Sequence, residues 1–311
     1  MSGIPQGTLA GPGTEIDLCP TDDAAHPAPG RDYFDLNGAC MSEEMLVLVR
    51  GGGDLGTGTA HRLHRAGFHV VVSELPQPLV IRRTVAFASA VFDACCQVEG
   101  VEATLASDRA EVERLLHQAV VPVIVDPSGE WISCLQPDVI VDARMAKRNL
   151  GTSLTNARIV IGLGPGFVAG QDVHAVVETM RGHNLGRVIL QGSAELDTHV
   201  PGLVQGYGRE RVVWAPCAGH FRGLVAIGEH LKTGQCVAKV AGTPVLAPIS
   251  GILRGLLHDD LRVREGQKVG DVDPGGVREH CFTISDKALA IAGGVLEAIL
   301  CLRHSPEGSI G

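Results

Sequence analysis

A glycine-rich segment between an apolar run and a helical pattern is the first feature of the sequence that could perform chemistry. Gly51, Gly53 and Gly56 form a G-x-G-x-x-G motif directly after the apolar run MLVLV. In such a loop the first glycine permits a tight turn, the second lets a pyrophosphate approach the backbone, and the third allows close contact between helix and strand. The start of the following helix offers unpaired N–H groups to a phosphate. The motif therefore predicts a phosphate-binding loop, although glycines that serve packing alone would leave the same pattern.

Two acidic residues bear on this prediction. Glu74 ends the next apolar segment, about 20 residues after the loop, where an acid commonly binds a ribose hydroxyl and favours NAD over NADP. Asp54 lies inside the loop, where a carboxylate beside a pyrophosphate is unfavourable unless it points away or meets a metal ion or a hydroxyl. NAD(P) is therefore a candidate cofactor, with Asp54 and Glu74 among the candidate binding residues.

Further candidate binding residues follow later apolar segments. Arg144 and Lys147 could supply cations to phosphates or carboxylates, although a solvated loop explains them equally well. Gly164 and Gly166 belong to a second glycine-rich loop, GLGPG. Parallel sheets place ligands at the carboxyl ends of their strands, so we expect these residues at the same edge as the first loop. There is no Ser-His-Asp order, H-E-x-x-H or G-K-[ST] loop, so no catalytic residue is assigned.

The pattern of residues 45–208 alternates apolar segments with helical ones. We expect strands over 45–49, 68–74, 121–125, 137–142, 158–163 and 187–192, and helices over 57–66, 80–88, 109–118 and 172–183. This alternation predicts a Rossmann-like parallel sheet with helices on both faces, forming a nucleotide-binding domain over residues 45–208.

The most distinctive organisation is an internal repeat. Residues 215–240 match residues 247–272 without a gap; for example, Arg222-Gly223-Leu224 corresponds to Arg254-Gly255-Leu256. Each copy predicts three short strands, and two copies related by a pseudo-twofold axis can bury their apolar faces together. The pattern resembles the biotinyl/lipoyl barrel-sandwich fold, so we expect such a domain over 209–275. The hairpin expected between the copies holds no lysine, which favours a structural or docking module over a carrier domain.

The two ends of the chain have different compositions. Residues 1–44 are rich in Gly, Pro, Asp and Ala and predict a disordered tail. Residues 276–311 predict a C-terminal helix, with Ser285 as its N-cap, that packs back on the first domain, followed by a short tail. Packing is also the simpler role for Cys281 and Lys287. The alternative is that Cys281 acts as a sulfur carrier or soft ligand and that Lys287 contacts an anion.

Composition limits the function classes. A formal charge of -9 argues against nucleic acid and anionic membranes as partners. There is no apolar run of about 18 residues and no signal-peptide pattern at the N-terminus, so we expect a cytoplasmic protein. The nine cysteines include no C-x-x-C pair, so no metal site is predicted.

Several long segments carry a family resemblance, among them LVRGGGDLGTGTAHRLHRAGF, VDARMAKRN and ISDKALAIAGGVLEAIL. They resemble the YqeB-type accessory proteins of the selenium-dependent molybdenum hydroxylase system. The resemblance implies an accessory or maturation role for a molybdenum hydroxylase, with molybdopterin cytosine dinucleotide as a further candidate ligand. It also implies a hydroxylase subunit or other maturation factors as partners. A homo-oligomer is compatible with it.

Two alternatives stay open at this point. The glycine loop with Glu74 suits an NAD-dependent oxidoreductase, although no convincing proton donor accompanies it. A non-enzymatic sensor or scaffold would bind a nucleotide and report it through the repeat domain. Whether the protein is an enzyme is not decided by its sequence.

Overall fold

The computed structural model of the protein describes residues 45–198 and 205–303. All of them belong to one unit of the chain, Cys40–Gly311. The tail predicted over residues 1–44 lies outside the described ranges. None of the helices within those ranges is long and apolar enough to cross a membrane.

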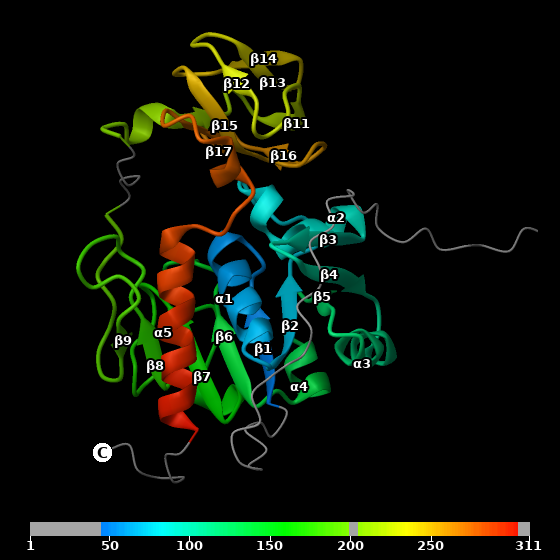
Figure 1. The fold of residues 1–311 in the computed structure, drawn as a ribbon, viewed down its shortest axis with the longest axis vertical. Helices are drawn as coiled ribbons and strands as arrows, with labels where there is room; N and C mark the ends of the chain where they lie inside the picture. The colour runs from blue at the N-terminus through cyan, green and yellow to red at the C-terminus, as the bar shows by residue number, and fades with distance from the viewer. Residues whose placement is uncertain (1–44, 199–204, 304–311) are drawn as a thin grey trace, which may run out of the picture. The chain divides into compact units, whose positions relative to one another are not determined.

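A mixed sheet forms the centre of the large lobe, which we define as residues 45–198 and 284–303 (Figure 1). Its strand order is β3-β4-β5-β2-β1-β6-β7-β8-β9, parallel in the middle, with β3–β4 and β8–β9 antiparallel at the two edges. The strands are β1 (Leu46–Arg50), β2 (His69–Glu74), β3 (Cys95–Val98), β4 (Val101–Ala106), β5 (Val121–Val125), β6 (Val139–Asp142), β7 (Ile159–Leu163), β8 (Ala175–Val177) and β9 (Val188–Ile189).

Side chains alternate between the two faces of this sheet, and both faces are covered. Val47 and Val49 of β1 belong to one buried cluster, while Leu48 belongs to another on the opposite face. The first cluster is shared with α1 (Asp54–Arg65) and α5 (Asp286–Leu302), and the second with α3 (Arg109–His117) and α4 (Trp131–Leu135). Burial on both faces explains why the central strands are continuous runs of Val, Ile and Leu.

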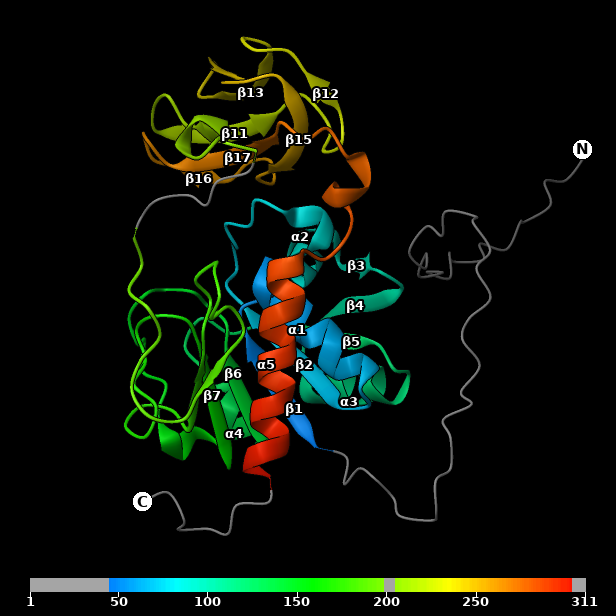
Figure 2. The same ribbon diagram turned by 60° about the vertical axis from the view of Figure 1, so that its left-hand side comes forward.

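Helices α1 and α5 lie side by side on one face of the sheet (Figure 2). Ser285 caps α5 by accepting a hydrogen bond from the backbone of Ala288, as its position in the sequence predicts. Glycines allow the close approach of α5: a Cβ on Gly58 would lie 2.8 Å from the Ala288 Cβ, and one on Gly294 would lie 2.1 Å from the Gly186 carbonyl oxygen.

The expected Rossmann-like parallel sheet is wrong, because the sheet is mixed and two of its crossovers lack helices. The connections β6–β7 and β7–β8 contain no α-helix, only the 3₁₀ turn η3 (Leu154–Asn156). The helix expected over 172–183 is absent, and β8 occupies its middle. The helix expected over 80–88 is replaced by the 3₁₀ turns η1 (Arg83–Val85) and η2 (Phe87–Ser89), with the short α2 (Ala90–Asp93) after them.

Two four-stranded antiparallel sheets form the small lobe, residues 207–273, with the orders β10-β17-β15-β12 and β14-β13-β11-β16. Their strands are β10 (Val212–Trp214), β11 (Gly219–Gly223), β12 (His230–Leu231), β13 (Cys236–Val240), β14 (Thr243–Leu246), β15 (Gly251–Leu256), β16 (Arg262–Val263) and β17 (Lys268–Asp273). Each copy of the repeat forms three strands, as predicted. Each sheet takes the two long strands of one copy and the short middle strand of the other.

The assignment of these residues to a barrel-sandwich domain of the biotinyl/lipoyl type is nevertheless wrong. The two sheets remain separate ladders, and within the described residues no strand pairing joins one sheet to the other. They are held together by apolar side chains that both sheets bury between them, including Phe221, Val240, Leu253 and Val272. The apolar repeat thus predicted the strands but not how they assemble.

Backbone contacts join the small lobe to the large one. The N–H of Leu256 in β15 donates to the carbonyl of Ile81, 2.8 Å away. A Cβ on Gly255 would lie 2.7 Å from that same carbonyl oxygen, so glycine is needed at this contact. The Arg82 Nη2 donates to the carbonyls of His280 and Thr283, in the segment that links the small lobe to α5.

We expect Gly56→Ala to destabilise the protein, since a Cβ at Gly56 would lie 1.9 Å from the Gly51 carbonyl oxygen. Such overpacking costs about 1–3 kcal/mol or more of the free energy of unfolding. Gly53→Ala is the matched control, because Gly53 has an ordinary φ of -70° and no atom within 4 Å of its Cβ position. Urea unfolding should separate the two variants. Equal stability for both would contradict the packing role of Gly56.

Candidate functional site

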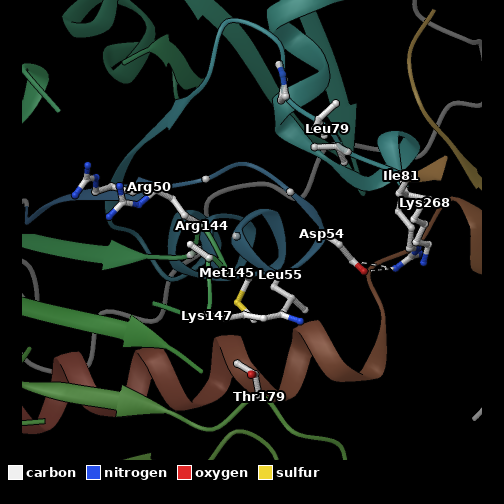
Figure 3. A pocket seen from close by; sticks show the side chains of 18 of the residues that line it. Arg50, Asp54, Leu55, Leu79, Ile81, Arg144, Met145, Lys147, Thr179 and Lys268 are labelled. Atoms are coloured by element: carbon white, nitrogen blue, oxygen red, sulfur yellow. Dashed lines mark hydrogen bonds and ion pairs between the residues drawn. The ribbon is translucent and has the colours of Figure 1, made fainter. Parts of the chain in front are cut away.

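A cavity of about 950 Å³ opens at the carboxyl ends of the central strands (Figure 3). Arg50 at the end of β1, Glu74 at the end of β2 and Arg144 after β6 line it. Pockets that hold small organic ligands have volumes of about 300–1,000 Å³. The cavity is therefore large enough for a ligand with more than one functional group.

The three glycines of the first loop have different physical roles. Gly51 has a φ of +101°, which only glycine adopts readily, and its N–H donates to the Ser73 carbonyl. Gly56 lets α1 approach the loop. Gly53 is the N-cap of α1, faces open space, and no side chain caps this helix end. The first N–H groups of α1 are therefore available to an anion in the cavity.

Glu74 holds the glycine loop in place. Its carboxylate accepts hydrogen bonds from the backbone N–H groups of Gly52 and Leu75, each at 2.8 Å. Burial raises the pKa of Glu74 above its ordinary value, while these two hydrogen bonds act in the opposite direction. Since both carboxylate oxygens already accept backbone donors, the residue stabilises the loop.

Two arginines share one buried anchor at the end of the cavity near β1 and β6. The Thr152 hydroxyl donates to Asp142 at 2.6 Å and accepts from Arg50 Nη1 at 2.9 Å and from Arg144 Nη2 at 3.0 Å. Arg144 also binds Asp142 through Nε at 3.0 Å. Burial alone would raise the pKa of Asp142, but the hydrogen bonds from Arg144 and Thr152 and the charge of Arg144 lower it below its ordinary value. This network fixes both guanidinium groups beside the glycine loop.

A left-handed segment carries Lys147 over the start of α1. Met145 and Lys147 have φ values of 55° and 61°, a conformation that costs non-glycine residues energy and recurs at functional sites. Lys147 forms an ion pair with Asp197, and both residues line the cavity. Figure 3 labels Lys147 and Leu55, a residue of the first turn of α1, and both line the cavity.

Gly164 and Gly166 allow close packing around the segment that contains Met145 and Lys147. A Cβ on Gly166 would lie 2.6 Å from the Arg148 backbone nitrogen, and one on Gly164 would lie 2.4 Å from the Thr179 hydroxyl. Neither glycine lines the cavity. Their role in the structure is close packing, and the predicted contact with a ligand has no support from their positions.

The carboxylate of Asp54 points to a buried arginine. The Arg82 Nη1 donates to both Asp54 oxygens, at 2.9 and 3.0 Å. Arg82 is only 8% exposed. The positive charge of Arg82 offsets the negative charge of Asp54 next to the start of α1. Asp54 would otherwise repel an anion at this place, and the ion pair removes that repulsion.

The small lobe also contributes to the cavity, which its sequence did not predict. Arg211, Arg254, Lys268 and Asp271 all line it. Arg211 and Lys268 form ion pairs with Asp271, at 2.5 and 3.7 Å. The cavity therefore extends from the glycine loop to the sheet that contains β15 and β17.

The described lining residues carry an excess of positive charge. Nine are cationic and six are acidic, in a chain whose formal charge is -9. The cationic side chains are Arg50, Arg82, Arg144, Lys147, Arg181, Arg211, Arg254, Lys268 and Lys287, and the acidic ones are Asp54, Glu74, Asp126, Glu195, Asp197 and Asp271. The cavity thus has an excess of positive charge in a chain with an excess of acidic residues overall, which favours an anionic ligand.

Seven of the nine predicted binding residues line this one cavity: Gly51, Gly53, Asp54, Gly56, Glu74, Arg144 and Lys147. Asp54 and Arg144 therefore share a site. Whether these residues bind a ligand stays a prediction. Cys281 is buried in the small-lobe core, where burial raises its pKa, and it does not line the cavity. The described residues contain no cluster of His, Cys, Asp and Glu that could hold a metal ion.

Comparison with known proteins gives one named relative. No protein-family model matches the chain. The chain is 48% identical over 263 residues to a protein of Escherichia coli named "Uncharacterized protein YqeB". The match covers 85% of this chain but only 49% of the relative. The chain therefore spans about half the length of the relative it matches.

Solved structures give only a weak likeness. One is a succinylglutamate desuccinylase/aspartoacylase from Rhodobacter sphaeroides, 13% identical, covering 74% of this chain and 85% of that chain with a TM-score of 0.23. Another is an aspartoacylase family protein from Mesorhizobium loti, 10% identical, covering 73% and 84% with a TM-score of 0.24. A likeness at this level carries no argument about the activity of the chain.

These names correct the interpretation drawn from the sequence. The YqeB name fits the relative, but that name states no function, and the solved structures are named as desuccinylases and aspartoacylases. The link to selenium-dependent molybdenum hydroxylases is therefore wrong as an assignment, and so is the accessory role it implied. The alternatives of an NAD-dependent oxidoreductase and of a nucleotide sensor gain no support from these comparisons.

Asp142→Asn tests the anchor of the two arginines. We expect it to lower the free energy of unfolding at neutral pH by about 1.5–3 kcal/mol, because buried hydrogen bonds to a charged group are lost. The folded-state pKa of Asp142 is below its ordinary value, so its contribution is present above about pH 4 and is lost as the pH falls through the folded-state pKa. In urea unfolding, the gap between wild type and variant should therefore narrow in acid.

Asp260→Asn is the matched control for this experiment. Asp260 is exposed, and its side chain lies outside the cavity. Its replacement should change the free energy of unfolding by less than about 0.5 kcal/mol at either pH. A gap between wild type and Asp142→Asn that stays constant from neutral pH to acid would contradict the anchor.

Proposed function

We propose that the protein binds a small organic anion, with a phosphate group over the glycine loop. The observation that carries this proposal is the excess of cationic side chains around a single cavity at the start of α1. The uncapped first turn of that helix supplies N–H donors, and the open face of Gly53 leaves room for an oxyanion next to them. A phosphate has enough oxygens to accept from the helix end and from a lysine together.

Lys287 is the side chain best placed to contact this anion. It lines the cavity from the first turn of α5 and is half-buried. Within the described residues its side chain has neither an ion pair nor a hydrogen bond, although the charges of Asp54, Glu178 and Asp197 act to raise its pKa. Burial, and then the charge of Arg181, lower the pKa of Lys287. An ammonium group that is half-buried without a partner is unfavourable, and an anionic ligand would relieve that cost.

The cytoplasmic location remains a prediction from the sequence. It agrees with a ligand drawn from small phosphorylated molecules, but the proposal does not depend on it.

Lys287→Met should weaken anion binding without destabilising the fold. We expect the dissociation constant for pyrophosphate, measured by isothermal titration calorimetry, to rise about 10-fold or more, since a hydrogen bond to a charged group contributes about 1.5–3 kcal/mol. The free energy of unfolding without ligand should stay equal or rise, because a half-buried charge without a partner is removed.

Lys239→Met is the matched control, since Lys239 is an exposed lysine of β13 outside the cavity. It should bind pyrophosphate as the wild type does. Citrate, titrated in parallel, distinguishes a phosphate site from a general carboxylate site, and tighter binding of citrate than of pyrophosphate would count against the phosphate. No binding of either probe by the wild type would overturn the proposed function.

A further inference from the structure

The two copies of the repeat treat one arginine differently. Arg222 in β11 and Arg254 in β15 occupy equivalent positions in the sequence, each followed by Gly-Leu. Arg222 is exposed and lies outside the cavity. Arg254 lines the cavity, and its side chain is 17% exposed. The equivalent arginine therefore faces solvent in the first copy and the cavity in the second.

A β-bulge accompanies this difference. In the first copy the pairing of β11 with β13 is regular through Arg222, which faces Lys239. In the second copy the register of β15 against β17 shifts between Leu253 and Gly255, at Arg254. Bulges leave one residue out of the ladder and often aim its side chain at a functional site. The bulge explains how Arg254 leaves the regular sheet face.

Arg254 lies in a group of positive charges, and its own side chain has weak contacts. Its Nη1 is 3.5 Å from the Asp273 carboxylate, too long for a strong hydrogen bond. Burial, and then the charge of Arg82, lower the pKa of Arg254. The Nε atoms of both arginines are buried and have no hydrogen-bond partner within the described part of the chain. A buried donor without an acceptor is costly.

Lys268 completes this group from β17. It lines the cavity, and its nearest carboxylate is that of Asp271, 3.7 Å away, which Arg211 already binds. Burial lowers the pKa of Lys268, Asp271 opposes this effect, and the charges of Arg211 and then Arg254 add to it. Together with Arg211, four cations from two lobes therefore surround one part of the cavity, and three carboxylates, those of Asp54, Asp271 and Asp273, neutralise them incompletely.

We propose that Arg82, Arg254 and Lys268 form a second anion subsite, so that one ligand with two anionic groups bridges the two lobes. This inference rests on the proposed function, which supplies the first anionic group at the glycine loop. Figure 3 shows Arg50 and Arg144 on one side of the start of α1 and Lys268 on the other, with Lys147 between them. The ligand therefore carries its two anionic groups on a spacer that reaches from the start of α1 to Lys268.

The test uses α,ω-alkane bisphosphonates of increasing length, titrated into the full chain by calorimetry. Methylene-, butane-1,4- and octane-1,8-bisphosphonate vary the spacer, and butylphosphonate offers one anionic group only. We expect one of the longer bisphosphonates to bind on the order of 100-fold tighter than butylphosphonate, because the second group binds at high effective concentration. Arg254→Met and Lys268→Met should each remove about 10-fold of this gain.

Pyrophosphate binding is the internal control, because it needs the first subsite alone and should be unchanged in both variants. Lys268→Met keeps the test decisive if Arg254→Met fails to fold. The Lys268 side chain is 39% exposed and therefore tolerates replacement more easily. Arg222→Met, the equivalent position of the first copy, should bind every probe as the wild type does.

The outcomes separate the two proposals. A bisphosphonate gain that both variants lose, with pyrophosphate still bound, supports the second subsite. If pyrophosphate binds but no bisphosphonate gains over butylphosphonate, or if the variants keep the gain, the second subsite is wrong and the proposed function stands. If the wild type binds neither pyrophosphate nor any bisphosphonate, the proposed function fails, and the bridging ligand fails with it.

Discussion

Positive charge gathered around one cavity is the constraint on which the rest of this structure depends. A guanidinium group removed from water needs acceptors, and most of the polar contacts described above serve that need. Arg144 is held by Asp142 and Thr152, and Arg82 by Asp54 and two backbone carbonyls. These partners fix the cations in position, but the acidic side chains that line the cavity are fewer than the cationic ones. Within the described part of the cavity, Arg254 has a carboxylate only at 3.5 Å, and the ammonium group of Lys287 has no ion pair.

The local elements of the fold follow from the sequence wherever apolar periodicity is strong. Strands β1 and β2 and helices α1 and α3 lie close to their predicted ranges, because a continuous Val/Ile/Leu run or an amphipathic stripe has few alternatives. Prediction failed over 172–183, where the segment pairs as β8 although its pattern allows a helix. The arrangement of strands into sheets could not be predicted, since pairing at the edges depends on contacts between distant segments.

The site was predictable only where a motif fixes the local backbone. The glycine loop and Glu74 were found because the pattern reflects steric needs, which the Gly51 φ and the Gly56 contact show directly, while Gly53 has open space around it. Arg82 and Lys268 gave no such signal. They reach the cavity because β15 packs on the backbone of Ile81, a contact between residues far apart in the chain.

The repeat shows why spacing alone could not reveal the role of Arg254. Both copies contain the same Arg-Gly-Leu sequence, so no sequence pattern distinguishes them. A single extra residue in the β15 ladder nevertheless places Arg254 at the cavity, while Arg222 remains in solvent. The glycine that follows contributes in the second copy as well: Gly255 meets Ile81 of the large lobe, whereas Gly223 of the first copy meets the side chains of Leu256 and Asp259. A duplicated unit can therefore keep one copy for packing while the other acquires a contact with a second lobe. In this chain the asymmetry between the copies, more than any motif within them, indicates where the small lobe acts.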